Sequence, residues 1–221
     1  MIIYHGSENL IYEPFIGGGN PANAYGKGFY CTEYPELAGE WACKKGTDGF
    51  INCYELDTKG LKICNLNSEE YNILNWLALL TKYRGYWQRK SIAEEAKTFL
   101  QENFLIDISK FDVICGYRAD DSYFSFVQDF IMGTISLQKL SMAMKFGDLN
   151  DQIVLKSEKA FRHLVFKGSE KADAAAYFSK KTQRDKEARR QYQELKPSVS
   201  VLDEVYILDI MRGARDGTLR L

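Results

Sequence analysis

The feature that most constrains the fold of this chain is the run Tyr25-Gly-Lys-Gly-Phe-Tyr-Cys-Thr, followed by a helical pattern over Pro35 to Ala42. Apolar residues after Pro35 recur at helical spacing, so the run predicts a loop, a short strand and a helix. Glycine has no Cβ, so its backbone can approach a flat ligand closely, and the rings of Tyr30 and Trp41 offer faces for stacking. The alternative is a glycine turn that leads into an ordinary core strand.

Composition limits the kind of protein. The chain has 221 residues, 45% hydrophobic and 27% charged, with a formal net charge of -1. These values suit one soluble domain, or one domain with an appendage, and they leave no overall positive charge that would attract a polyanion. Five cysteines without a C-x-x-C pair and two histidines argue against both a disulfide framework and a metal site. No apolar run suggests a membrane span, so we expect a cytoplasmic protein unless a non-standard secretion route delivers it.

His5 stands at the end of the first apolar run, Met1 to Ser7, which has the pattern of a buried strand. Such a strand would place the His5 side chain at the rim of the sheet, where a ligand could reach it. The alternative is a histidine that bonds a neighbouring carbonyl group. Residues 12 to 24 contain three successive glycines and two prolines, which predicts a mobile loop able to close over a ligand.

The middle of the chain predicts strands at 49–56 and 61–64, the second as the hairpin or sheet partner of the first. Helical patterns follow over about 68–84 and 92–104. Residues 66–105 match none of the segments that carry the family resemblance given below, and we interpret them for that reason as an insertion. Its residues Trp76, Arg84 and Trp87 fit the core and surface of this insertion, with substrate contact as the alternative.

Two aspartates follow a buried strand predicted at 111–116. A carboxylate at a strand end suits a general base or the stabilisation of a cation, which makes Asp121 a candidate catalytic residue and Asp120 its alternative. Either aspartate can instead cap the helix that begins near Ser122. Helices are predicted to follow from there to Met132 and over 137–146.

The last third of the chain begins with a strand led by Gln152, and residues 160–166 suggest the next strand. Residues 169–195 are charged and helical, and their basic face over 180–190 fits a solvated surface, with contact to a phosphate backbone or to an acidic partner as the alternatives. We therefore divide the chain into a domain at 1–168 and a charged helical C-terminal appendage at 169–221.

Three segments together carry a family resemblance: Tyr4-His5-Gly6-Ser7, the run from Gly26 to Thr32, and the strand led by Gln152. In this order they resemble the signature of the ADP-ribosyltransferase superfamily, in its diphtheria-toxin and poly(ADP-ribose) polymerase branch. The likeness is closest to an uncharacterised group of small bacterial proteins within it. The resemblance implies an α+β fold in which split antiparallel β-sheets form an NAD cleft, with inserted helices. It does not reach the C-terminal appendage.

The resemblance also implies roles for individual residues. His5 would bond the adenosine ribose, Gly6 would pair with the nicotinamide amide, and Ser7 would hold the adjacent ribose. Gly28 would let the backbone approach NAD, while Tyr30 and Trp41 would stack on nicotinamide. The 13–24 loop matches the donor loop by position.

Gln152 departs from the pattern of the better studied members, which carry glutamate there. Glutamine donates and accepts hydrogen bonds but supplies no charge and no base. We therefore expect Gln152 to lie by the nicotinamide ribose, with Asp121 or Asp120 as a source of the missing charge.

The function implied is mono-ADP-ribosyl transfer from NAD to an unidentified macromolecular acceptor, a protein or a nucleic acid, in a bacterial toxin, effector or defence role. A catalytically silent module that binds NAD or ADP-ribose is one alternative, and an NAD glycohydrolase with the same site is another. No metal and no membrane partner are expected.

Overall fold

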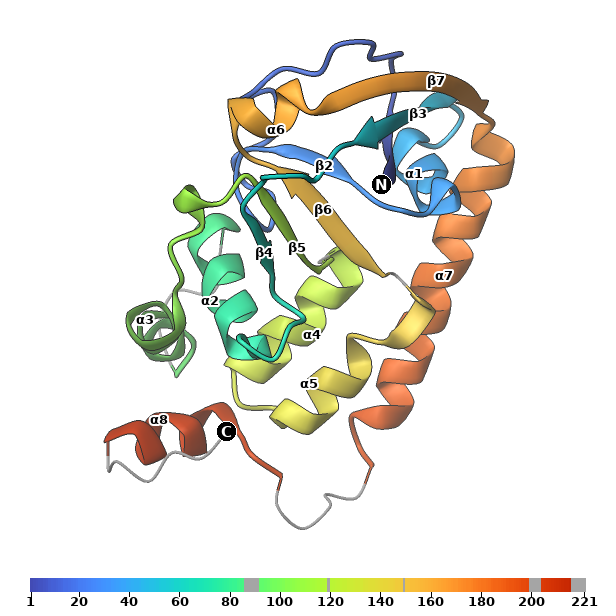
Figure 1. The fold of residues 1–221 in the computed structure, drawn as a ribbon. Helices are drawn as coiled ribbons and strands as arrows, with labels where there is room; N and C mark the ends of the chain where they lie inside the picture. Colours follow the sequence, from blue (N-terminus) through green and yellow to red (C-terminus); the bar gives the residue numbers. More distant parts are fainter. Residues whose placement is uncertain (86–91, 119, 149, 199–203, 216–221) are drawn as a thin grey trace.

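The structure is a computed structural model that describes residues 1–85, 92–118, 120–148, 150–198 and 204–215. The chain forms two small β-sheets, the first at the top of the view in Figure 1 and the second near its centre, with most of the helices below and beside the second sheet. The strands are β1 (Ile2–Ser7), β2 (Phe29–Cys31), β3 (Gly49–Leu56), β4 (Ile63–Asn65), β5 (Val113–Tyr117), β6 (Asp151–Leu155) and β7 (Leu164–Ala172). The α-helices are α1 (Pro35–Ala42), α2 (Ile73–Tyr83), α3 (Ile92–Phe104), α4 (Asp121–Ile131), α5 (Leu137–Ala143), α6 (Glu158–Arg162), α7 (Ala174–Leu195) and α8 (Ile207–Arg215), and the short 3-10 helices are η1 (Ile108–Lys110) and η2 (Phe146–Asp148).

The sheets confirm the predicted α+β class but correct one pairing. The first sheet has the order β1-β3-β7 and is antiparallel, and the second has the order β2-β6-β5-β4. The expectation that 61–64 pairs with 49–56 is wrong, because β4 pairs in parallel with β5. The reason lies in the connection: α2 and α3 stand between β4 and β5, and a crossover of that length permits parallel pairing where a hairpin does not. The second sheet is therefore mixed rather than antiparallel.

The two sheets are tied together where β1 passes the end of β2. The Tyr4 N–H donates to the carbonyl oxygen of Thr32 at 2.7 Å, and the Thr32 N–H donates to that of Tyr4 at 3.0 Å. This bridge brings the first predicted motif beside the second.

Strand β6 separates two parts of the hydrophobic core. Ile153 and Leu155 pack between the sheets, whereas Val154 packs against the helical side of the molecule. Side chains alternate along a strand, so Gln152 shares the face of Val154. Tyr30 is the cross-strand partner of Val154, and it therefore lies on this same face.

Local capping explains where several helices begin. The Asn72 side chain accepts from the Leu74 N–H at 2.9 Å at the start of α2, and the Asp173 carboxylate accepts from the Ala175 N–H at 2.6 Å at the start of α7. Ser157 caps α6 by accepting from the Ala160 N–H at 3.1 Å. The expectation of a strand over 160–166 is therefore wrong in its first half: α6 runs to Arg162 and β7 follows.

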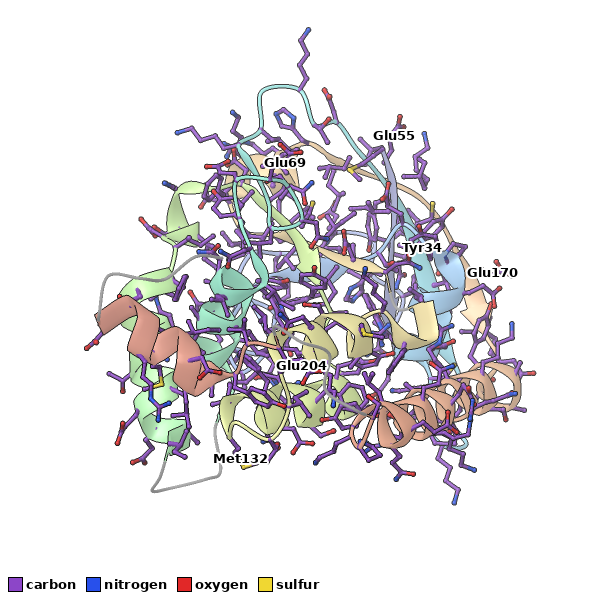
Figure 2. All side chains as sticks on the ribbon, turned by 90° about the horizontal axis from the view of Figure 1, so that it is seen from below. Tyr34, Glu55, Glu69, Met132, Glu170 and Glu204 are labelled. Atoms are coloured by element: carbon purple, nitrogen blue, oxygen red, sulfur yellow. The ribbon has the colours of Figure 1, made fainter. Side chains whose placement is uncertain are left out.

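The predicted boundary between the domain at 1–168 and the C-terminal appendage at 169–221 falls inside a strand. Strand β7 spans residues 164 to 172 and pairs with β3 on both sides of 168. Figure 2 shows Glu170 of β7 near the start of α7, and Tyr34 at the start of α1. Helix α7 then runs along the molecule beside α1 and α5 (Figure 1). Among the described residues, no helix is long and apolar enough to cross a bilayer.

Candidate functional site

A cavity of ≈ 710 Å³ collects residues from both sheets and from α1, α4 and α7. This volume is in the range typical of small-molecule sites, roughly 300–1,000 Å³. Among the predicted site residues, those that line it are His5, Gly6, Tyr30, Trp41, Asp120 and Gln152. Ser7 and Gly28 are not among its lining residues, and the side chain of Asp121, the first residue of α4, lies outside the described part of the structure.

His5 is held by the strand that follows the glycine loop. Its Nδ1 donates to the carbonyl oxygen of Tyr30 at 2.7 Å, and its ring stacks on Phe29 with centroids 4.2 Å apart. A carbonyl oxygen can only accept, so Nδ1 carries the proton and Nε2 is an acceptor in the neutral ring. Burial lowers the pKa of His5, the bond to Tyr30 opposing this only in part, and so favours that neutral form.

Tyr30 is fixed through its hydroxyl group. The hydroxyl donates to the Gly26 carbonyl oxygen at 2.7 Å and accepts from the Tyr25 N–H at 3.0 Å. The Lys156 ammonium ties down the same loop, donating to the carbonyl oxygens of Tyr25, at 2.8 Å, and Lys27. Tyr30 therefore presents a rigid ring to the cavity.

The glycines of the two motifs are explained by protein contacts. A Cβ on Gly6 would lie 1.8 Å from the Ala38 carbonyl oxygen of α1, and one on Gly28 would lie 2.5 Å from Val154 Cγ1. Both positions need glycine because another element passes close by. Close approach of a ligand to Gly28, the expectation from the sequence, stays a prediction.

Ser7 belongs to a polar corner at the end of β1. Its hydroxyl donates to the Asn9 carbonyl oxygen at 2.6 Å and accepts from Asn52 Nδ2 at 2.9 Å. Asn52 is fully buried, and its Oδ1 accepts from the Ile11 N–H at 3.0 Å. These bonds hold the strand end and the following loop together.

Trp41 lines the cavity with a buried arginine behind it. The Arg118 guanidinium lies 4.5 Å from the Trp41 ring centroid, and only 2% of the Arg118 side chain is exposed. Its Nε donates to Asp120 at 2.7 Å, and its Nη2 pairs with the same carboxylate. Asp120 occupies the N-cap position of α4 but makes no side-chain cap bond, because Arg118 engages its carboxylate.

Gln152 ends in a buried amide oxygen without a partner. Its Oε1 has no hydrogen-bond partner among the described residues, and the side chain lines the cavity. A buried polar atom left unpaired costs roughly 1–3 kcal/mol, so this oxygen suits a donor group on a ligand. Tyr30 and Gln152 share one face of the sheet, on adjacent strands.

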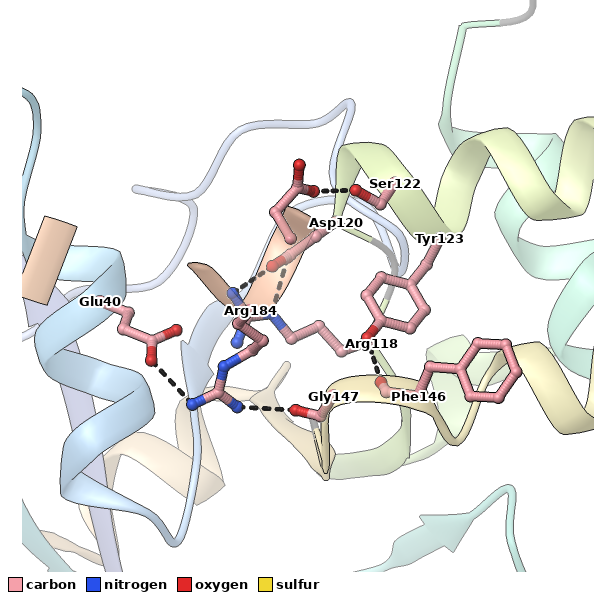
Figure 3. Close-up of polar contacts among 9 residues, drawn as sticks. Glu40, Arg118, Asp120, Ser122, Tyr123, Phe146, Gly147 and Arg184 are labelled. Carbon is pink, nitrogen blue, oxygen red and sulfur yellow. Dashed lines mark hydrogen bonds and ion pairs between the residues drawn. The ribbon is translucent and has the colours of Figure 1, made fainter. Parts of the chain in front are cut away.

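A group of charged residues that the sequence did not single out completes the site. Arg184 of α7 donates from Nη2 to the buried Glu40 of α1 at 2.7 Å and from Nη1 to the Gly147 carbonyl oxygen at 3.0 Å (Figure 3). Tyr123 donates to the Phe146 carbonyl oxygen in the same group. Burial raises the pKa of Glu40, although Arg184 opposes this. The only sequence signal was a glutamate, Glu40, within the predicted helix that ends at Ala42.

The insertion residues divide between core and site. Trp76 is fully buried, which confirms it as core, while Arg84 lines the cavity with its guanidinium 4.4 Å from the Phe124 ring centroid. Trp87 lies outside the described residues. Across the described ranges, no group of three or more His, Cys, Asp or Glu side chains could hold a metal ion.

The fold and the site define a mixed α+β protein with a cavity lined by aromatic and charged residues. One face of the second sheet, helix α1 and helix α7 form walls of this cavity. The chain belongs to the family described as "Protein of unknown function (DUF3990)", which matches residues 1–166. No curated protein and no solved structure matches it. The matched range holds every predicted site residue, whereas α7 lies beyond it.

Proposed function

We propose that the protein is a mono-ADP-ribosyltransferase that binds NAD in this cavity and transfers ADP-ribose to a macromolecular acceptor. One observation carries the proposal: His5, Tyr30 and Gln152, from three separate segments, line a single cavity. They are the residues by which the sequence resembles the superfamily, and a chance match would not require them to meet.

The physical chemistry of the site agrees with this proposal. The fixed Tyr30 ring and the Trp41 ring offer apolar faces for a nicotinamide ring. The neutral His5 has Nε2 as an acceptor for a ribose hydroxyl, and the unpaired Gln152 oxygen is a second acceptor. In the reaction, the bond between nicotinamide nitrogen and ribose carbon breaks and its electron pair leaves with nicotinamide. An acceptor nucleophile then bonds that carbon and loses its proton.

Stabilisation of the ribosyl cation falls to the carboxylates of the cavity, because Gln152 is neutral. Asp120 and Glu40 both line the cavity, and each is paired with an arginine. Such pairing lowers the net negative charge that either carboxylate presents to a cation. We therefore expect slow turnover, with Asp120, whose side chain is 34% exposed, more accessible than the buried Glu40.

The test is incubation of the full chain with NAD labelled on the adenylate, in parallel with protein, DNA and RNA pools. Transfer of label to one pool together with nicotinamide release supports the proposal. Tyr30→Ala, which removes the stacking ring, should abolish both signals. Absence of both label transfer and nicotinamide release from the unmodified chain would overturn it.

A silent NAD-binding module is the second candidate, favoured by the neutral Gln152 and the arginine-paired carboxylates. NAD binding with neither nicotinamide release nor label transfer would support this candidate. Nicotinamide release without label transfer would instead indicate NAD hydrolysis, in which water attacks the same carbon.

A further inference from the structure

Helix α7 forms one wall of the cavity although it lies beyond the family match at 1–166. Its lining residues are Phe178, Lys181, Thr182, Arg184, Asp185 and Arg189. The helix is held in place where Lys180 pairs with Glu36 of α1, and where Tyr177 covers Gly39. The wall is therefore a fixed part of the cavity.

The carboxylates that line the cavity are all engaged by cations. Glu40 accepts from Arg184 at 2.7 Å. Asp185 accepts from Arg189 at 2.9 Å and from the Ser122 hydroxyl. Asp120 accepts from Arg118. Each of these carboxylates is therefore already partly neutralised by its own arginine.

Positive charge remains after this pairing. Lys181, half-buried in the α7 wall, makes no hydrogen bond and no ion pair with any described residue. Arg118 pairs with Asp120 and is not a lining residue of the cavity, but its Nη1 has no hydrogen-bond partner within the described ranges. An uncompensated ammonium in a partly enclosed site attracts an anion more strongly than one in open water, because the local dielectric constant is lower.

We propose that the α7 wall of the cavity is a binding site for the phosphate or diphosphate group of a nucleotide, with Lys181 as its principal cation. Lysine binds phosphate as a point charge through several N–H donors. The outer face of α7 does not extend this charge into a surface for a polyanion. There Arg190 pairs with Glu187 and Glu194, and Lys180 pairs with Glu36. The charges therefore fit a small anion inside the cavity, and this inference does not require ADP-ribosyl transfer.

The test compares ADP, inorganic pyrophosphate and adenosine by titration calorimetry on the full chain. ADP and pyrophosphate should bind, and adenosine at least about tenfold more weakly than ADP. Lys181→Ala should weaken ADP and pyrophosphate binding by about ten- to a hundredfold, and Lys181→Arg, which keeps the charge, should restore most of it. Lys186→Ala is the matched control, since Lys186 is an exposed lysine of α7 outside the cavity lining. Its affinities should equal those of the unmodified chain.

Two further arms identify the source of the phosphate. If Lys181→Ala weakens binding of NAD but not of nicotinamide riboside, the site takes the diphosphate of the dinucleotide. If it weakens ADP and pyrophosphate but leaves NAD unchanged, the site takes a phosphate of a second ligand. Either result supports the site, even where nicotinamide release is absent. The inference is overturned if pyrophosphate does not bind, if adenosine matches ADP, or if folded Lys181→Ala and Lys186→Ala give the same affinities.

Discussion

The Nδ1 of His5 donates to the main-chain carbonyl oxygen of Tyr30 at 2.7 Å, so a side chain of β1 is bonded to the backbone of β2. With the bridge between Tyr4 and Thr32, this bond fixes the two sheets against each other. It also selects the tautomer of His5, because only a protonated Nδ1 can donate to a carbonyl oxygen. The same bond therefore serves the fold and sets Nε2 as an acceptor in the cavity.

The unfolding free energy should fall on acidification because of His5. Burial lowers its pKa in the native state, so the unfolded chain binds more protons once the pH drops below about 6.5. The loss of stability should develop from that pH downward and end below the native pKa. Urea denaturation at about pH 7.5 and about pH 5.5 measures it.

His5→Gln should make the stability difference between these two pH values smaller than in the unmodified chain. His163→Gln is the control, since it removes the other histidine and keeps His5. An unchanged pH dependence in His5→Gln would contradict the assignment.

Tyr30→Phe should destabilise the loop of the second motif while keeping the ring. The variant removes the hydroxyl that bonds the Gly26 carbonyl oxygen and the Tyr25 N–H, and a buried group left unpaired costs about 1–3 kcal/mol. Urea denaturation should show a loss of that size. The control is Tyr12→Phe, at a position 63% exposed, where little change is expected. Equal effects in the two variants would show that the hydroxyl bonds of Tyr30 do not hold the loop.

The sequence predicted what depends on near neighbours. The order of loop, strand and helix over 25–42 is local, which explains why β2 and α1 are found where expected. Two later helices begin after the predicted residues: α2 starts at Ile73 rather than near 68, and α7 starts at Ala174 rather than at 169, because residues up to 172 pair in β7. The reason for glycine at position 28 could not be predicted from near neighbours in the sequence. Gly28 is explained by Val154 on β6, a contact that only the strand pairing brings about.

The charged part of the site depends on contacts between distant parts of the chain. Glu40 and Arg184 are 144 residues apart, and the basic face of α7 gave no sign that one of its arginines is paired inside a cavity. The pairing partner of β4 was predicted wrongly for the same reason. A short strand after a turn is typical of a hairpin, and only the crossover through α2 and α3 allows its parallel pairing with β5. The meeting of His5, Tyr30 and Gln152 was predicted only through the family resemblance.

Gly6→Ala should destabilise the protein strongly, because the new Cβ would lie 1.8 Å from the Ala38 carbonyl oxygen. Relief requires α1 to move away from β1, and overpacking of this kind costs typically about 1–3 kcal/mol and occasionally more. Gly85→Ala is the matched control, since nothing lies within 4 Å of a Cβ there. Thermal unfolding of both variants measures the difference. A Gly6→Ala protein as stable as Gly85→Ala would contradict the close packing of α1 on β1.

Gln152→Glu should raise the rate of nicotinamide release if the proposed reaction occurs. The substitution supplies a negative charge beside the ribosyl cation, and the loss of one such stabilising group typically costs enzymes about a hundred- to a thousandfold in rate. We therefore expect a rise of at least about tenfold, with Gln152→Ala lower than the unmodified chain. The rate follows from chromatography of free nicotinamide. A Gln152→Glu protein that binds NAD normally and is no faster would show that a carboxylate at this position does not limit the reaction.

Arg184→Met should leave the buried Glu40 carboxylate without its cation. Removal of one partner of a buried pair costs about 3–5 kcal/mol, and the 24% exposure of the Arg184 side chain places the expected loss at the lower end of that range. Loss of Arg184 removes an interaction that lowers the pKa of Glu40, so that pKa should rise further. The native state then binds more protons than the unfolded state as the pH falls, and the destabilisation should be smaller at about pH 5 than at about pH 7.5.

Glu40→Gln added to Arg184→Met should recover part of the loss at the higher pH, because no buried charge remains. Urea denaturation of the double-mutant cycle measures this coupling, and Arg190→Met, which breaks exposed ion pairs, should change little. Additive effects at both pH values would mean that Glu40 and Arg184 do not stabilise each other across the wall of the cavity.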